Sequence, residues 1–199
     1  MDHRYGIGAS EAGAVCGYGF KTPLQLWKEK TGEQVASDLS ANERVQFGNA
    51  VEDPLRDLFR VMYPNYQLDF TPFTILRRDD RHTFMFSTPD GWLTELATGR
   101  KGLYESKSST LLSAANYTEW KDKIPMGYYC QLLHSMYVGD FEFAVLFAIL
   151  LNKEHDAAIR AYWFEREEVK DDIAWLVSKE APFWNHVERR TMPPTQIIF

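Results

Sequence analysis

Two carboxylates and one lysine lie within the segment 88–107, which reads TPDGWLTELATGRKGLYESK. Asp90 stands in a Pro-Asp-Gly turn, and Glu105 and Lys107 lie at the end of the segment with Ser106 between them. Carboxylate oxygens bind Mg2+, and a bound Mg2+ polarises a phosphate group and lowers the pKa of a bound water. A lysine adds a compact positive charge that can orient the attacking water. These residue types therefore suit the hydrolysis of a phosphodiester.

The residues between Asp90 and Glu105 are typical of a β-hairpin. Strand-forming residues at 92–96 precede turn residues at 98–102, and a strand resumes at 103–105. Because a hairpin folds back on itself, its two ends lie side by side. We therefore expect Asp90 to lie near Glu105.

Within the second strand of this hairpin, residues two apart share a face. Glu105 and Lys107 are therefore expected to project to one side of the sheet and Ser106 to the other. A hairpin that carries solvated acidic and basic side chains has the same pattern. The three charged residues alone leave both interpretations open.

The composition is typical of a globular protein with one domain. Of the 199 residues, 45% are apolar and 25% are charged, which is enough to bury a hydrophobic core. We expect a single domain over 1–199, in which N-terminal helices within 9–63 pack on a sheet-containing core, 66–190, followed by a tail, 191–199. A net charge of −6 argues against a surface that coats nucleic acid broadly, but it permits a local basic groove.

The cysteines and the apolar runs indicate a cytoplasmic protein. Cys16 and Cys130 are too few for a disulfide framework, an iron–sulfur cluster or a zinc site made of cysteines, and we expect them to be buried free thiols. The longest apolar run, 143–151, is shorter than the roughly 20 residues that span a bilayer. Residues 1–10 lack the apolar region of a signal peptide.

Capping signals predict helices in the N-terminal part. Ser10 is a suitable N-cap for a short helix over 11–16. The sequences at 22–25 and 40–43 are capping boxes, and the helix that begins at the second one is expected to end at Tyr63, before a proline. This helix N-terminus could also hold an anion, because it presents free N–H groups and Arg4 could add a phosphate contact. Alternatively, these residues are only a cap and a surface arginine.

Glu52 borders the apolar stripe of the long helix before Tyr63. That stripe consists of Val51, Leu55, Leu58, Phe59 and Met62. A carboxylate rarely faces a core without a cation or a hydrogen-bond donor, and Gly48, one turn earlier, indicates close packing on the same side. Glu52 is therefore either an active-site carboxylate or a residue at the rim of the buried face.

The second half of the chain is expected to combine strands with helices. A buried strand at 84–86 leads into the Pro-Asp-Gly turn, 141–151 reads as a hydrophobic central strand, and 157–164 reads as its antiparallel partner. A helix carries Gln131, which either satisfies local polar groups or hydrogen-bonds a phosphate or a metal-bound water. The last helix is expected over 167–187.

Five short motifs follow one another along the chain. They are RYGIGAS (4–10), GNAVE (48–52), STPDG (87–91), ESK (105–107) and YYCQ (128–131). This succession resembles the YqaJ and phage-lambda-type alkaline exonucleases of the PD-(D/E)xK nuclease superfamily. The resemblance implies an α/β fold in which a mixed central β-sheet is flanked by helices.

The resemblance also implies a metal site and its ligands. Asp90 and Glu105 match the paired metal-binding carboxylates, and the backbone carbonyl of Ser106 matches a further ligand. Lys107 matches the lysine that positions the attacking water. The cofactor implied is a pair of Mg2+ ions, for which Mn2+ could substitute.

Further positions match supporting residues of the family's active site. Glu52 and Gln131 match two of them, and Asp80 or Asp79 matches an acidic residue that precedes the Pro-Asp turn.

A pocket for a terminal 5′-phosphate is implied as well. Its residues match Arg4, Ser10 and Thr88 of this chain. Thr88 replaces the serine of the lambda enzyme and keeps a hydroxyl group. The spacing from Arg4 to Ser10 is one residue shorter than in that enzyme.

The activity implied is 5′-to-3′ digestion of one strand of linear double-stranded DNA, in the cytoplasm of a bacterium or a phage-infected host. The product would be a 3′ single-stranded overhang that a strand-annealing protein takes up during recombination. The family suggests a ring of three subunits, to which the apolar tail 196–199 could contribute. Two alternatives remain, a site- or structure-specific endonuclease of the same superfamily and a non-catalytic DNA- or protein-binding module on the same fold.

Overall fold

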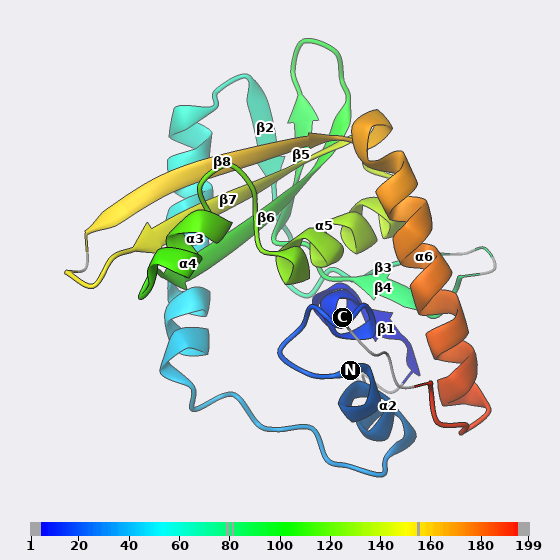
Figure 1. Ribbon diagram of the computed structural model, residues 1–199. Coiled ribbons are helices and arrows are strands. Elements are labelled where there is room, and N and C mark those ends of the chain that lie inside the picture. The colour runs from blue at the N-terminus through cyan, green and yellow to red at the C-terminus, as the bar shows by residue number, and fades with distance from the viewer. Residues whose placement is uncertain (1–4, 79, 81, 155, 195–199) are drawn as a thin grey trace.

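Two β-sheets with helices packed against them make up the fold (Figure 1). The computed structural model describes residues 5–78, 80, 82–154 and 156–194. The helices of this part are η2 (Ala9–Glu11), α1 (Ala12–Val15), α2 (Pro23–Thr31), α3 (Glu43–Met62), α4 (Ala114–Glu119), α5 (Met126–Val138) and α6 (Arg166–Glu188). The strands are β1 (Ile7–Gly8), β2 (Tyr66–Asp69), β3 (Leu76–Arg77), β4 (Met85–Ser87), β5 (Gly91–Glu95), β6 (Lys101–Thr110), β7 (Phe143–Leu151) and β8 (Ala157–Glu165).

Both sheets mix parallel and antiparallel pairs. The larger sheet has the strand order β2-β5-β6-β7-β8, in which β6 and β7 are parallel and the other neighbours are antiparallel. The smaller sheet has the order β1-β4-β3, in which β1 runs parallel to β4. The expected mixed α/β fold is confirmed, with β6 rather than β7 as the central strand of the larger sheet.

Helices cover both faces of the larger sheet. On one face α3 buries Phe59 against the rings of Tyr104 and Phe147. On the other face α5 and α6 pack over Leu103 and Leu146. Successive side chains of a strand point to opposite faces, so β6 contributes Tyr104 to one core and Leu103 to the other. The central strand is therefore fixed from both sides.

The hairpin predicted from the sequence is confirmed. β5 and β6 pair antiparallel, with Gly91 opposite Tyr104 and Thr94 opposite Lys101. The second strand begins earlier and runs further than expected, from Lys101 to Thr110, because it pairs with β7 along its whole length. The turn that carries Asp90 is thus anchored to the middle of the sheet.

The two serine caps predicted from the sequence are wrong. The first short helix begins at Ala9, and the carboxylate of Glu11 accepts from the backbone N–H of Gly8, so Ser10 is an exposed residue inside the first turn. The long helix is capped by Asn42, whose side chain accepts from the N–H of Arg44, instead of by Ser40. In both places a side chain nearer the helix satisfies the free N–H groups.

Other local predictions hold. Thr22 caps α2 through a hydrogen bond from the N–H of Gln25, and Gly32 ends that helix in the left-handed conformation. Cys16 and Cys130 are buried and unbridged. Within the described ranges, no helix has both the length and the hydrophobicity that a bilayer span requires.

A buried histidine–glutamate pair joins α5, α6 and β4. His134 Nδ1 lies 2.9 and 3.0 Å from the two carboxylate oxygens of Glu180, and both side chains are fully buried. His134 Nε2 lies 3.0 Å from the carbonyl oxygen of Phe86, to which it donates. Because β4 leads directly into the Asp90 turn, this pair fixes the approach of that turn to α5.

We expect Glu180→Ala to lower the free energy of unfolding by about 3–5 kcal/mol, because it leaves the imidazole of His134 buried without its partner. Urea unfolding followed by circular dichroism measures this. Glu167→Ala on the same helix is the control, since Glu167 is exposed and pairs with Lys170 at the surface, where an ion pair contributes little. Equal losses in the two variants would show that the buried pair adds nothing to stability.

Candidate active site

Asp90 is held at both its carboxylate and its backbone. Its Oδ2 accepts hydrogen bonds from the backbone N–H and the Oγ of Ser106, each 2.8 Å long. Its carbonyl oxygen accepts from Nη1 of Arg56 at 3.0 Å. Among the described residues, Oδ1 of Asp90 has no hydrogen-bond donor. One carboxylate oxygen is therefore oriented by the protein while the other remains available to a ligand.

Glu105 is buried and is held by two donors. Lys107 Nζ lies 2.6 Å from Oε1 of Glu105, and Nε2 of Gln131 donates to the same oxygen. The Glu105 side chain is 4% exposed. Lys107 also lies over the ring of Tyr128, with Nζ 5.4 Å from its centre. The predicted common face of Glu105 and Lys107 is confirmed, and Gln131 of α5 completes the cluster.

Negative charge is concentrated here. Burial and the charge of the Asp90 carboxylate together raise the pKa of Glu105 to about 7, against the opposing effect of Lys107. Burial and the charge of Asp90 likewise raise the pKa of Glu52. For Lys107, burial opposes protonation, but the Glu105 and Asp90 carboxylates outweigh it and raise its pKa. The three carboxylates repel one another, and a bound cation would relieve that repulsion.

Glu52 reaches this cluster from α3. The helix packs across β6, and the half-buried Glu52 carries a pKa raised by the charge of Asp90, which places the two carboxylates within electrostatic reach. One turn later on the same helix, Arg56 is buried and donates to the Asp90 backbone. Arg56 was missed by the sequence analysis, although a long basic residue four positions after a candidate carboxylate is the usual spacing of a helical ion pair.

The donor set fits a divalent cation that prefers oxygen. The carboxylates of Asp90 and Glu105 and the carbonyl of Ser106 are hard ligands of the kind that Mg2+ takes, with water completing the shell. Within the described residues, no group of three or more His, Cys, Asp or Glu side chains is placed to hold a metal ion. A cation would therefore be held by the carboxylate pair, the backbone and solvent or substrate oxygens.

The residues matched to a 5′-phosphate pocket lie at one end of the smaller sheet. Gly8 of β1 pairs in parallel with Phe86 of β4, and Ser10 and Thr88 each follow two residues later. Both are exposed. Two strands that run in the same direction end at the same edge, so this pairing places Ser10 and Thr88 at the same edge of the sheet. Arg4 lies outside the described residues.

The glycines of the N-terminal motif allow this pairing. A Cβ at Gly6 would collide with the carbonyl oxygen of Phe84, and one at Gly8 would lie 3.0 Å from the ring of Phe86. Their role in the structure is therefore close approach of β1 to β4.

The acidic residue before the Pro-Asp turn is not joined to the carboxylate cluster. Asp80 is exposed, its carboxylate pairs with Arg78, and it accepts from the backbone N–H of His82. Asp79 lies outside the described residues.

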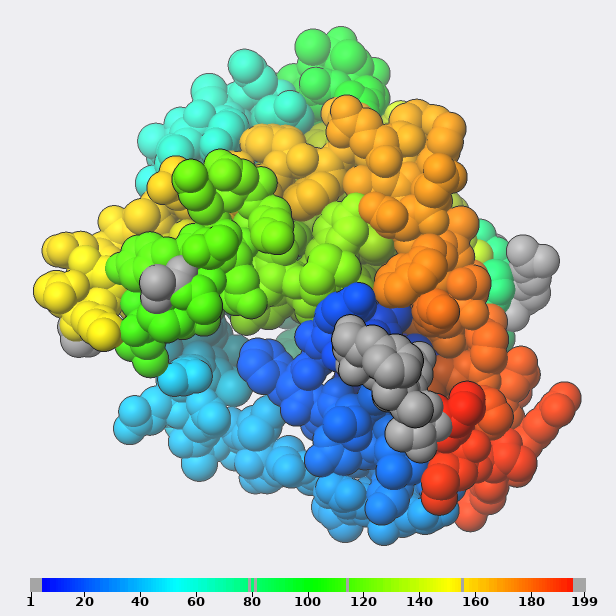
Figure 2. Space-filling model, viewed as in Figure 1, coloured from blue at the N-terminus to red at the C-terminus, as the bar shows by residue number. Residues whose placement is uncertain are grey.

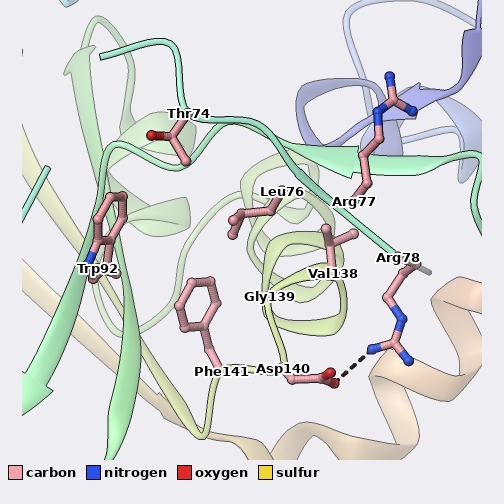
Figure 3. A pocket seen from close by; sticks show the side chains of 9 residues that line it. All are labelled: Thr74, Leu76, Arg77, Arg78, Trp92, Val138, Gly139, Asp140 and Phe141. Carbon is pink, nitrogen blue, oxygen red and sulfur yellow. Dashed lines mark hydrogen bonds and ion pairs between the residues drawn. The ribbon is translucent and has the colours of Figure 1, made fainter. Parts of the chain in front are cut away.

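One pocket of the structure lies apart from the carboxylates. It has a volume of about 520 Å³ and is lined by Trp92 of β5, Leu76 of β3 and Phe141, which follows α5. Figure 3 shows Arg78 and Asp140 at one side of it, joined by an ion pair of 2.8 Å. None of the predicted metal-binding residues lines this cavity.

A different concavity is visible on the surface. Figure 2 shows the face hollowed between the blue N-terminal segment, the beginning of α3 in light blue and the green segment around α4. These segments flank the second half of β6, which carries Lys107.

The fold and this arrangement of residues define a class of recombination proteins. The chain belongs to the family of the YqaJ-like viral recombinase domain, whose family model matches residues 1–142. A relative in Bacillus subtilis (strain 168), the protein YqaJ, is 30% identical over 188 residues, which are 93% of this chain and 54% of the relative. The chain therefore spans about half the length of the curated relative that it matches.

Solved structures of alkaline exonuclease share the fold. The alkaline exonuclease LHK-Exo from Laribacter hongkongensis superimposes with a TM-score of 0.70 at 14% sequence identity, over 94% of this chain and 90% of that chain. A phage-related exonuclease from Haemophilus somnus 129PT gives a TM-score of 0.58 at 14% identity, over 93% and 96% of the two chains. The expected PD-(D/E)xK fold is confirmed.

We expect Mn2+ or Mg2+ to raise the melting temperature of the protein, because a cation that binds only the folded state stabilises it. At ten times its dissociation constant the gain is about 1.4 kcal/mol. Asp90→Asn and Glu105→Gln should each remove most of this gain, since each loses a charged ligand. Differential scanning fluorimetry with and without the cation measures it.

Asp57→Asn is the control for this experiment, because Asp57 is an exposed carboxylate on α3 that pairs only with Arg60 at the surface. A gain that is the same in all four proteins would mean that the cation binds elsewhere.

Proposed function

We propose that the protein is a Mg2+-dependent exonuclease that digests one strand of linear double-stranded DNA in the 5′-to-3′ direction. The observation that carries the proposal is the convergence of Asp90, Glu105 and Lys107 on adjacent strands, with Gln131 from α5 bound to Glu105. The family and the fold of alkaline exonuclease support the same activity. The structure of LHK-Exo in complex with dAMP, a nucleotide, adds a relative that binds the monomer unit of DNA.

Each residue of the cluster has a role in this proposal. Asp90, Glu105 and the Ser106 carbonyl would hold Mg2+, which when bound polarises the scissile phosphate and activates water. Lys107 is kept protonated by its ion pair with Glu105, so it donates hydrogen bonds and positive charge toward the attacking water and the phosphate. Gln131 holds Oε1 of Glu105 and thereby directs the other carboxylate oxygen, and Glu52 adds negative charge from α3.

The remaining features of the proposal concern the end of the DNA and the assembly. Arg4, Ser10 and Thr88 would bind the terminal 5′-phosphate. Two Mg2+ ions would act together, with Mn2+ as a substitute, and the 3′ overhang would pass to a strand-annealing protein. We extend the proposal to a ring of three subunits, since a nuclease that encloses its substrate stays on it.

We expect Asp90→Ala, Glu105→Ala and Lys107→Ala each to lower the rate of digestion by at least about 100-fold, because each removes one preorganised charge from the reacting phosphate. The assay is digestion of a linear duplex with Mg2+, resolved on a denaturing gel, with Ca2+ in place of Mg2+ as a negative control.

Lys101→Ala is the matched variant for this assay, since Lys101 is an exposed lysine on the same strand as Lys107. Near-normal digestion by purified Asp90→Ala protein would rule out the mechanism. Cleavage of covalently closed circular duplex at a similar rate would instead favour an endonuclease.

We expect Arg4→Ala to slow digestion of a 5′-phosphorylated duplex by roughly 10–100-fold, which is the loss expected for one charge-assisted hydrogen bond to phosphate. Digestion of a duplex with a 5′-hydroxyl end should change much less. The exposed Arg189 at the end of α6 provides the control substitution, Arg189→Ala. If Arg4→Ala slows both substrates equally, these residues do not form a phosphate pocket.

A further inference from the structure

Arg56 is a buried cation that links its own helix, α3, to the Asp90 turn and to the residue after β2. Its side chain is 5% exposed. Nη1 donates to the carbonyl oxygen of Asp90 at 3.0 Å, Nη2 donates to Oδ1 of Asp53, and the guanidinium lies 3.8 Å from the centre of the Phe70 ring. Glu52 Oε2 is 4.0 Å from Nη1. A buried arginine is costly unless its donors are satisfied, so this set of contacts fixes the guanidinium in one place.

The carbonyl that Arg56 binds lies just outside the ladder of β5. The pairing of β5 with β2 ends at Trp92 opposite Asp69, and its pairing with β6 begins at Gly91 opposite Tyr104. The Asp90–Gly91 peptide immediately precedes these paired residues. Arg56 supplies a donor to that peptide from a helix, where the sheet supplies none.

Asp90 is consequently held at two points on opposite sides of its Cα. Arg56 fixes the backbone carbonyl, and the N–H and Oγ of Ser106 fix one carboxylate oxygen. Together these contacts set the direction of Oδ1. Removing the backbone contact would leave the carboxylate attached to Ser106 but free to swing with the peptide.

We propose that Arg56 is a positioning residue, which clamps the Asp90–Gly91 peptide so that Asp90 presents Oδ1 to a divalent cation. This inference rests on the proposed metal-dependent nuclease and adds a residue that does not itself touch the metal or the DNA. Groups that hydrogen-bond to a metal ligand and orient it are needed for tight metal binding, and their loss lowers metal affinity by about 10–100-fold.

Arg60 provides a matched control one turn further along α3. It also pairs with an aspartate three residues earlier, Asp57, and it also donates to a backbone carbonyl, that of Leu68, at 3.2 Å. The two arginines thus make the same kinds of contact from the same helix. They differ in burial and in the element that they hold: Arg56 is buried and holds the Asp90 turn, whereas Arg60 is 44% exposed and holds an edge strand.

The test measures Mn2+ binding to the whole chain by electron paramagnetic resonance, without DNA. We expect Arg56→Met to weaken Mn2+ binding by about 10–100-fold and Arg60→Met to change it by less than about threefold. Arg56→Lys keeps the charge but has no planar fork, so it should recover only part of the affinity. The Mg2+ concentration that gives half the maximal nuclease rate should rise in parallel in the Arg56 variants.

Four results would overturn the clamp. They are wild-type affinity in folded Arg56→Met, equal losses in Arg56→Met and Arg60→Met, full recovery in Arg56→Lys, and no Mn2+ binding by the wild type. Full recovery would mean that charge alone matters. If Arg56→Met fails to fold by circular dichroism, the Mn2+ affinity of Arg56→Lys decides between clamp and charge.

The outcomes also separate this inference from the proposed function. A wild-type protein that binds Mn2+ and digests DNA, with unchanged affinity in the Arg56 variants, removes only the clamp. A wild-type protein that neither binds Mn2+ nor digests DNA removes the metal-dependent nuclease and the clamp together.

Discussion

The burial of Glu105 is the constraint on which the rest of this site depends. A buried carboxylate is destabilising unless hydrogen-bond donors or cations contact it, and the neighbouring carboxylates add electrostatic repulsion. Lys107 on the same strand and Gln131 on α5 supply the donors. The helix that provides Gln131 is in turn fixed by His134, whose imidazole joins it to α6 and β4. The central strand, α5, α6 and β4 are thus connected through one buried carboxyl group.

Local signals in the sequence were enough to predict the hairpin and the cluster that it forms. The turn chemistry between Asp90 and Glu105 set the fold-back, and the period of two along a strand placed Lys107 beside Glu105. These predictions succeeded because they depend on neighbours along the chain. The boundaries were less accurate, since β6 extends to Thr110 through pairing with a strand that lies far away in the sequence.

The parts of the site that the sequence did not reveal depend on contacts between distant elements. Nothing near Arg56 indicates that its guanidinium would meet the carbonyl of a residue on another element. The part played by the Ser106 side chain was missed for the same reason, because only the folded hairpin brings its Oγ to Asp90. The wrong caps at Ser10 and Ser40 have a different cause, which is that these helices begin at other residues: Glu11 accepts from the N–H of Gly8, and Asn42 accepts from the N–H of Arg44.

The parallel pairing of β1 with β4 has a consequence for how this domain can vary. Parallel neighbours cannot be joined by a tight turn, so the chain makes a long crossover through α2 and α3 before it returns. The register of Gly8 on Phe86 places Ser10 and Thr88 at the same edge of the smaller sheet, and it is independent of the length of that crossover. The exposed segment between α2 and α3 can therefore lengthen, shorten or change in sequence among relatives while the two hydroxyls keep their places.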